Sequence, residues 1–217
     1  MRRRRVSCDC KHREDEALAT GVSFEAIVLA AGSGRRFGGD KLLAPWGSGF
    51  LLESALAAAF AAPARSVTVI VGANAAGVSQ AARAFDARAL IVHAADHAEG
   101  MGASLRTGIA SLPADTTGVF VFLGDMPRVP TSVLPKLAEA VMAGALAAAP
   151  TFQQRRGNPV LIGHKLFPQL LALSGDAGAR SVLQDLGERL ALIESPDDGV
   201  LFDVDKKGDL NTHGSSP

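Results

Sequence analysis

Short apolar stretches alternate along most of the chain with longer stretches rich in Ala and Leu. The apolar runs cover residues 26–30, 67–73, 89–94, 118–125 and 145–152. Unbroken runs of this kind are typical of strands buried on both faces. The segments between them favour helices over residues 50–62, 74–86, 104–112 and 131–143. This alternation predicts a doubly wound, mostly parallel α/β sheet, in which ligands bind at the carboxyl ends of the strands.

Capping residues mark the starts of two expected helices, and the apolar content indicates where the domain begins and ends. Asn74 and Thr131 precede two of the expected helices and are good N-cap residues. The last third of the chain is less regular, and we expect it to complete the sheet without a domain boundary. Residues 1–16 contain hardly any apolar side chains, and we expect a disordered tail over 1–22, one domain over 23–212 and a short tail over 213–217.

Composition excludes several classes of protein. The chain has 217 residues, 47% of them hydrophobic, which is enough for a sizeable core. Lys plus Arg and Asp plus Glu both number 22, so no global charge favours nucleic acid or a membrane surface. No apolar run is long enough to cross a bilayer, and we expect a cytoplasmic protein. Cys8, Cys10 and His12 have no second ligand pair elsewhere, so a tail is favoured over a metal site there.

A glycine-rich, cationic loop follows the first expected strand directly. Its glycines and cations are Gly32, Gly34, Gly38, Gly39, Arg35, Arg36 and Lys41. Glycine lets backbone N–H groups approach a ligand closely, and the cations complement phosphate. The dinucleotide fingerprint fails because position 37 is Phe, and the P-loop motif fails because Lys41 precedes Leu42. A flexible surface loop is the alternative, but the position after a buried strand favours a phosphate site.

The stretch L-A-A-G-S-G-R-R-F-G-G-D-K resembles the signature loop of the molybdenum cofactor nucleotidyltransferases. The family pattern is L-A-A-G-x-G-x-R-F-G with a lysine shortly after, as in the cytidylyltransferase branch. The residues that match it are Leu29, Ala30, Ala31, Gly32, Gly34, Arg36, Phe37, Gly38 and Lys41. Guanylyltransferase relatives usually show L-A-G-G and R-M-G instead. The resemblance extends from about Phe24 to Leu210 and implies a Rossmann-like nucleotidyltransferase fold.

This resemblance implies a nucleotide site built from several segments. The implied nucleotide-binding residues are Leu29, Ala30, Ala31, Gly32, Gly34, Arg36, Lys41, Gly72, Gly102 and Ser104. Gly102 and Ser104 match the family's G-M-G-x-S-L segment, where Ser104 is expected to begin a helix whose N-terminus binds the nucleotide. Ordinary capping by a serine is the alternative. Arg36, Lys41 and Asp125 are the expected catalytic residues.

Two acidic motifs are expected to hold Mg²⁺, which prefers oxygen ligands. Asp125 follows a buried strand in G-D-M-P and matches the family's metal-binding aspartate, although a turn aspartate before Pro127 would look the same. Asp203 and Asp205 form D-V-D. We expect their side chains to face opposite ways, with Asp205 as the second ligand and Asp203 as the alternate. The family continues D-V-D-T-P-E-D-L, whereas this chain continues D-V-D-K-K-G-D-L.

Two polar turns in the last third match the family's substrate segments. R-G-N-P and G-D-x-G-A-R are placed by the resemblance near the pterin, which carries over Asn158, Asp176 and Arg180 as substrate-binding residues. Taken as residues alone, both turns are ordinary surface loops. The histidines at 93, 97, 164 and 213 show no ligand spacing, so a hydrolase triad is not supported.

The resemblance implies transfer of a cytidylyl group from CTP to molybdenum-molybdopterin, giving the cytosine dinucleotide cofactor and pyrophosphate. Mg²⁺ is the expected cofactor, and a molybdoenzyme that receives the product is a candidate partner. One alternative is a GTP-using guanylyltransferase or related nucleotidyltransferase. Another is a chaperone that binds the cofactor and delivers it to a molybdoenzyme. A preference for GTP over CTP would distinguish the first alternative from CMP transfer. Cofactor binding without metal-dependent turnover would favour the chaperone.

Overall fold

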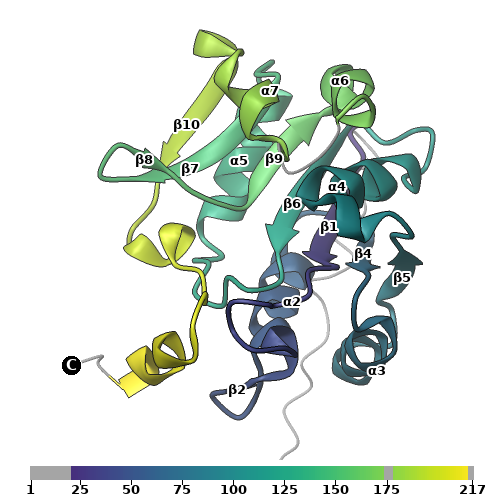
Figure 1. Ribbon diagram of the computed structural model, residues 1–217. Helices are drawn as coiled ribbons and strands as arrows, with labels where there is room; N and C mark the ends of the chain where they lie inside the picture. The colour runs from purple at the N-terminus through teal and green to yellow at the C-terminus, as the bar shows by residue number, and fades with distance from the viewer. Residues whose placement is uncertain (1–20, 174–177, 215–217) are drawn as a thin grey trace, which may run out of the picture.

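The computed structural model describes residues 21–173 and 178–214, which form a twisted central sheet with helices on both faces (Figure 1). The main sheet has the order β10-β7-β9-β6-β1-β4-β5, and β8 pairs with β7. Its strands are β1 (Phe24–Ala30), β4 (Val67–Val71), β5 (Leu90–His93), β6 (Gly118–Leu123), β7 (Ala147–Phe152), β8 (Arg155–Arg156), β9 (Val160–Gly163) and β10 (Leu190–Glu194). Each strand expected from the apolar runs is present.

Most strand pairs are parallel, as the alternating pattern predicts. β1 pairs in parallel with both β4 and β6, so that Val28 lies between Val69 and Phe122. β4 also pairs in parallel with β5, and β7 with β10. The exceptions are β9, which lies between β6 and β7 and is antiparallel to both, and β8, which is antiparallel to β7. The expected doubly wound, mostly parallel sheet is confirmed.

Helices cover the two faces of the sheet in separate layers. They are α2 (Leu51–Ala61), α3 (Ala75–Phe85), α4 (Met101–Ala110), α5 (Val133–Met142), α6 (Phe167–Leu171) and α7 (Arg180–Gln184). Short 3-10 segments are η1 (Lys41–Leu43), η2 (His97–Glu99), η3 (His164–Leu166), η5 (Gly187–Arg189), η6 (Asp198–Leu201) and η7 (Lys207–Gly214). One core cluster contains residues of α2, α3 and α5, and the other contains residues of α4, α6 and α7.

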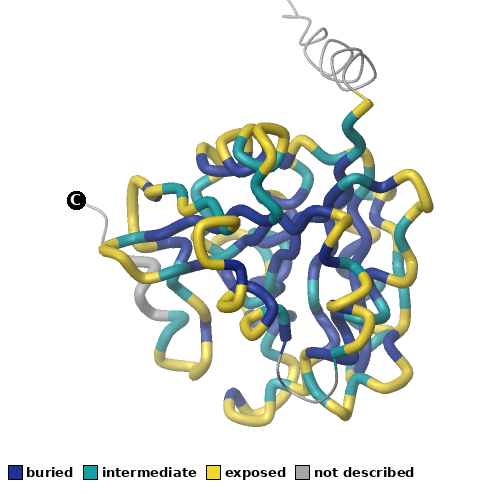
Figure 2. The backbone as a smooth tube through the Cα atoms, turned by 90° about the horizontal axis from the view of Figure 1, so that it is seen from above, coloured by how far each residue is buried: buried dark blue, intermediate teal, exposed yellow. Residues whose placement is uncertain are grey.

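The alternation of side chains along β1 divides the core between these layers. Ala26, Val28 and Ala30 belong to the cluster beneath α2, α3 and α5, whereas Ile27 and Ala31 belong to the cluster beneath α4. Successive side chains of a strand point to opposite faces, so a strand covered on both sides is apolar throughout. Figure 2 shows the buried backbone in the middle of the molecule and exposed loops around it.

Several local expectations are corrected by the structure. α4 begins at Met101 after Gly100, so Gly102 and Ser104 lie in its first turn and Ser104 does not begin the helix. α5 begins at Val133 without a side-chain cap, so Thr131 is not the cap. The expected cap at Asn74 is confirmed, because its side chain accepts a hydrogen bond from the Gly77 N–H.

A small hairpin before α2 was not foreseen from the sequence. Its strands are β2 (Pro45–Trp46) and β3 (Gly49–Phe50), which pair in an antiparallel manner. Trp46 packs with Phe37 and Val204 in a third buried cluster, which ties the glycine-rich loop to the C-terminal segment. In Figure 1, β1 and β6 both point toward the part of the molecule where this hairpin and η7 lie.

The ends of the chain lie largely outside the described residues. Residues 1–20, and with them Cys8, Cys10 and His12, are not described, nor are residues 215–217. The described part includes Val22, which packs against the core, and η7, which continues to Gly214. No helix among the described residues combines the length and the apolar character that crossing a membrane requires.

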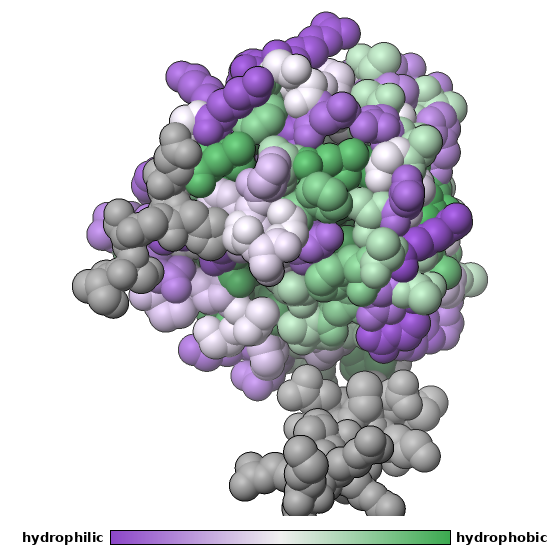
Figure 3. Space-filling model, turned by 90° about the horizontal axis from the view of Figure 1, so that it is seen from below, coloured by the Kyte–Doolittle hydropathy of each residue, from purple (hydrophilic) through white to green (hydrophobic). Residues whose placement is uncertain are grey.

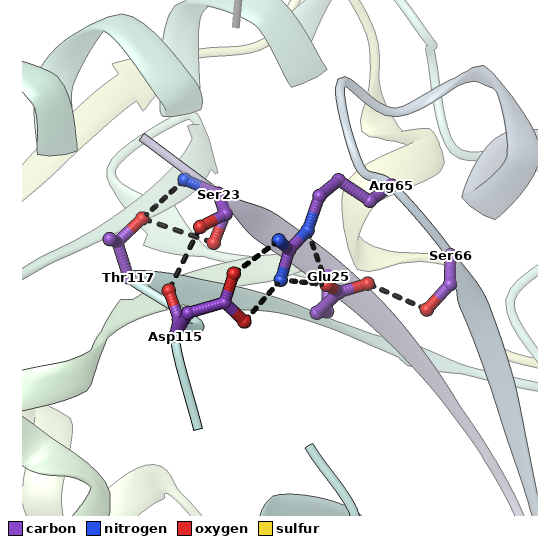
Figure 4. Close-up of polar contacts among 6 residues, drawn as sticks. All are labelled: Ser23, Glu25, Arg65, Ser66, Asp115 and Thr117. Atoms are coloured by element: carbon purple, nitrogen blue, oxygen red, sulfur yellow. Dashed lines mark hydrogen bonds and ion pairs between the residues drawn. The ribbon is translucent and has the colours of Figure 1, made fainter. Parts of the chain in front are cut away.

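A buried carboxylate, that of Glu25, lies at the amino ends of the central strands, where β1 starts. Glu25 is only 2% exposed and accepts hydrogen bonds from the guanidinium of Arg65 and from the Ser66 hydroxyl. Arg65 also bonds both carboxylate oxygens of Asp115, so it bridges the segments that precede β4 and β6 (Figure 4). Charge buried in this way requires its partners, so this cluster stabilises the fold.

Candidate active site

The glycine-rich loop after β1 is closed by its own backbone. The Gly34 carbonyl accepts hydrogen bonds from the N–H groups of Phe37, Gly38 and Gly39. Gly34 has a φ of 59°, in the left-handed region that suits glycine. The Phe37 ring is buried and anchors the loop from below, whereas Arg36 is exposed. The loop therefore presents its cationic side chains from a fixed backbone.

The loop meets the end of β6 through an ion pair. The Lys41 ammonium donates a hydrogen bond to Asp125 Oδ2 at 2.6 Å. The Lys41 side chain is 15% exposed and the Asp125 side chain 25% exposed, so both remain open to a ligand. Ends of neighbouring parallel strands lie at one edge of a sheet, which is why residues so distant in sequence meet here.

A cavity of about 450 Å³ lies along this edge of the sheet. The expected site residues that line it are Leu29, Ala30, Ala31, Gly32, Gly34, Lys41, Ser104 and Asp125. A smaller hollow of about 230 Å³ next to the loop adds Arg36 and Asp205. Figure 3 views this side of the molecule and shows hydrophobic residues in the middle of the face and hydrophilic residues around its margin. The structure thus brings most of the expected nucleotide-binding residues to one place.

The C-terminal D-V-D segment reaches the same edge. The Val204 N–H donates a hydrogen bond to the Asp125 carbonyl at 3.0 Å, and the Val204 side chain is fully buried. Asp203 and Asp205 are exposed on either side of it. The expectation that they face opposite ways is wrong, because residues two apart in an extended segment share a face.

Asp203 is influenced electrostatically by the other two acidic residues of this region. Burial, together with the negative charges of Asp205 and Asp125, raises the pKa of Asp203. Asp205 lines the hollow beside the loop together with Lys41, whereas Asp203 does not line it but lies within electrostatic range of Asp125, Asp205 and Lys41. Repulsion of this kind is relieved by a cation.

Comparison with known proteins places this arrangement in a family. A model of the MobA-like NTP transferase domain matches residues 26–190. The chain belongs to this family. Nicotine blue oxidoreductase of Paenarthrobacter nicotinovorans is 31% identical, over 82% of this chain and 90% of that protein. Purine catabolism protein PucB of Bacillus subtilis strain 168 is 29% identical, with the same coverage of 82% and 90%.

Other similar proteins point to the same fold. Molybdenum cofactor cytidylyltransferase of Escherichia coli K12 is 23% identical over 88% of this chain and 95% of that protein. The crystal structure of Rv0371c from Mycobacterium tuberculosis H37Rv superposes with a TM-score of 0.76 at 26% identity, covering 88% of this chain and 97% of that chain. The established family is broader than the expected transfer of CMP to molybdopterin.

A divalent metal has been seen in a similar structure. Rv0371c has also been solved in complex with manganese; that structure has a TM-score of 0.66 and 24% identity, covering 80% of this chain and 88% of that chain. In the described part of this chain, no three His, Cys, Asp or Glu side chains are gathered as a ready-made metal cluster. Divalent cations such as Mg²⁺ keep several waters and use one or two carboxylates with substrate phosphates, so such an ion does not require a cluster of three protein ligands.

Two expected nucleotide-binding glycines do not line the cavity. Gly102 is buried in the first turn of α4, next to Met101, which does line it. Gly72 lies behind the cavity wall: a Cβ there would come within 2.6 Å of the Ala31 carbonyl oxygen and 2.7 Å of the His97 ring. Gly72 therefore has a packing role, since it leaves room for the His97 side chain.

His97 is the cavity residue that the sequence pattern missed. It lines the large cavity from η2, and its Nδ1 lies 2.9 Å from the Ala94 carbonyl oxygen. Dispersed histidines gave no ligand spacing in the sequence. The useful signal was its position, three residues before the G-M-G-x-S-L motif, together with Gly72, which follows the end of β4.

The two expected substrate turns come from separate parts of the chain. The Asn158 N–H donates a hydrogen bond to the Val200 carbonyl, and a Cβ at Gly157 would come within 2.2 Å of the same oxygen. R-G-N-P is thus fixed against the segment that leads to D-V-D. Burial and, after it, the positive charge of Arg180 lower the pKa of Arg156, so the two guanidinium groups lie within electrostatic range of each other. Asp176 lies outside the described residues.

Proposed function

We propose that this protein transfers CMP from CTP to the phosphate group of molybdenum-molybdopterin and releases pyrophosphate. The observation that carries this proposal is the cavity after β1, where a cationic glycine-rich loop faces the Asp125 carboxylate. Membership in the MobA-like NTP transferase family supports nucleotidyl transfer as the type of reaction. The choice of CTP and of the acceptor rests on the resemblance of the loop motifs.

The reaction requires no protein nucleophile. A phosphate oxygen of the acceptor forms a new bond to the α-phosphorus of CTP, and the bond from that phosphorus to the bridging oxygen of the leaving pyrophosphate breaks. Negative charge accumulates on the leaving group. Arg36 and Lys41 are placed at the loop to hold it, and such preorganised charge is the main catalytic device in phosphoryl-type transfer.

Lys41 changes partner in this scheme. Its ammonium is bonded to Asp125, and both side chains are partly exposed in the cavity wall. A triphosphate that enters the cavity competes for the ammonium and releases the Asp125 carboxylate. The ion pair therefore gives the Lys41 ammonium and the Asp125 carboxylate a partner of opposite charge until the triphosphate binds.

Asp125, with Asp203 and Asp205, would hold Mg²⁺, which supplies charge neutralisation for the phosphates when bound. The crowding that raises the pKa of Asp203 is the observation on this chain that supports a cation there. The protein's own contribution is to keep these carboxylates within reach of the loop, through the hydrogen bond from the Val204 N–H to the Asp125 carbonyl.

The acceptor is proposed to lie beside the R-G-N-P turn. Asn158, Asp176 and Arg180 are the candidate substrate residues, and Arg156 joins them because Arg180 lies near it. Two neighbouring arginines without a described carboxylate partner suit an anionic acceptor. A phosphate-bearing pterin meets this requirement.

A second candidate function comes from the 31% identical relative. That protein is named as an oxidoreductase that acts on nicotine blue, and it is more similar in sequence than the cytidylyltransferase at 23%. The dinucleotide fingerprint is absent from the loop here, because Phe37 occupies the third glycine position. This favours nucleotidyl transfer over a redox reaction.

One assay separates the candidates. Purified protein is incubated with molybdenum-molybdopterin, Mg²⁺ and each of CTP, GTP, ATP and UTP, and pyrophosphate is measured. Fastest release with CTP supports the proposal, and fastest release with GTP indicates the guanylyltransferase alternative. Oxidation of a reduced nicotinamide or flavin cofactor in the presence of a dye substrate, without pyrophosphate release, would favour the redox alternative.

A further inference from the structure

The wall of the large cavity contains the imidazole of His97 as well as residues of the glycine-rich loop. His97 lies on η2 and lines the large cavity together with Gly100, Met101 and Ser104. Its ring fills the space left by the missing side chain of Gly72, against the Ala31 carbonyl. The backbone of two strand ends thus fixes the position of the ring. A side chain held this firmly is suited to reading a ligand.

The hydrogen bond at Nδ1 determines what the other ring nitrogen offers. A backbone carbonyl only accepts, so Nδ1, at 2.9 Å from the Ala94 oxygen, carries the proton. In the neutral ring Nε2 is then a hydrogen-bond acceptor. Within the described residues, Nε2 has no hydrogen-bond partner, and the ring makes an edge contact with the His93 ring at 6.1 Å between centroids.

The distribution of charge orients a nucleotide in this cavity. The cationic lining residues, Arg35 and Lys41, lie on the loop after β1. The wall formed by η2 and the start of α4 contributes uncharged polar and apolar groups there, among them Ser104 and Met101. Phosphates are attracted to the loop, so the base is directed to the His97 wall.

We propose that His97 reads the nucleobase by accepting a hydrogen bond at Nε2 from an exocyclic amino group, which selects cytosine over uracil. Cytosine presents its N4 amino group as a donor, whereas uracil presents an oxygen acceptor at the same position. An acceptor facing an acceptor leaves both unpaired, and sites built on a hydrogen bond reject such analogues strongly. This inference rests on the proposed nucleotidyl transfer and adds the residue that sets its base choice.

The test is equilibrium binding of CTP and of UTP, with Mg²⁺ and without acceptor, measured by calorimetry. Wild-type protein should bind CTP at least about tenfold more tightly than UTP. His97→Phe keeps a ring over Gly72 but has no acceptor, and it should bring the two affinities to within about twofold. His97→Gln offers an amide oxygen on a flexible chain and should restore part of the preference. Pyrophosphate release is measured in parallel.

His164→Phe is the matched control, because its Nδ1 also lies near a backbone carbonyl, that of Thr117 at 3.3 Å, but at the far edge of the sheet. This variant should keep the wild-type ratio. Equal binding of CTP and UTP by wild-type protein, or an unchanged ratio in His97→Phe, would overturn the assignment of His97. Loss of discrimination in His97→Phe, with no pyrophosphate release from wild type when molybdenum-molybdopterin is added, would uphold the assignment of His97 and refute the proposed transfer to that acceptor.

Discussion

Removing the Arg65 guanidinium should destabilise the fold, because it leaves the buried Glu25 carboxylate without its charged partner. Glu25 is 2% exposed, and Arg65 bonds it at 2.7 Å from Nε and at 2.6 Å from the terminal nitrogen. The Ser66 hydroxyl, at 2.6 Å, would remain. Breaking a buried pair on one side costs about 3–5 kcal/mol. The Arg65 side chain is 41% exposed, so water offsets part of this and we expect about 2–3 kcal/mol for Arg65→Ala.

The experiment is urea and thermal unfolding of wild type, Arg65→Ala and Arg65→Lys. A loss of about 2–3 kcal/mol corresponds to a Tm lower by roughly 4–12 °C in a domain of this size. Arg65→Lys keeps the charge but loses the fork that bonds Glu25 and Asp115 together, so its stability should lie in between. If Arg65→Ala unfolds within about 0.5 kcal/mol of wild type, the buried carboxylate does not depend on this partner and the reasoning fails.

Three further predictions concern the site. Arg36→Ala should lower kcat/KM for pyrophosphate release, which corresponds to a loss of about 2–4 kcal/mol of transition-state stabilisation. A wild-type kcat/KM would show that Arg36 does not contact the phosphates. A Cβ at Gly32 would meet nothing within 4 Å, so Gly32→Ala should leave the Tm unchanged yet weaken CTP binding in calorimetry; unchanged binding would show that no ligand approaches there. The pKa of Asp203 is raised by burial, Asp205 and Asp125, so the folded state loses stability as pH rises through that pKa. Asp203→Asn should therefore raise the Tm at about pH 8 in EDTA but not at about pH 3, and equal Tm values at both would contradict the crowding.

The strands and the loop could be predicted because local signals and the fold agree there. Ala26 to Ala30 is apolar throughout since both faces of β1 are covered, and Asn74 caps its helix as its side-chain chemistry suggests. The ion pair of Lys41 with Asp125 was within reach of the same argument, because both follow parallel strands.

Other features depend on contacts that no local pattern encodes. The antiparallel insertion of β9 between β6 and β7 is decided by pairing across the sheet. The hydrophobic pattern of a short strand does not indicate whether the strand runs parallel or antiparallel to its neighbours. His97 lies at the cavity because Gly72, distant in sequence, leaves room for its ring. The side-chain directions in the D-V-D segment were predicted wrongly. In an extended chain, side chains two residues apart share a face, so Asp203 and Asp205 lie on the face opposite to the buried Val204.

The central claim is that Asp125 and the loop after β1 form a nucleotidyl-transfer site. The most direct test is Mg²⁺-dependent pyrophosphate release from CTP and molybdenum-molybdopterin by Asp125→Asn, compared with Asp185→Asn, which changes an exposed aspartate after α7. Asp125→Asn should lower kcat by at least about 100-fold with a Tm near that of wild type, and Asp185→Asn should match wild type. Wild-type turnover by Asp125→Asn would contradict the account.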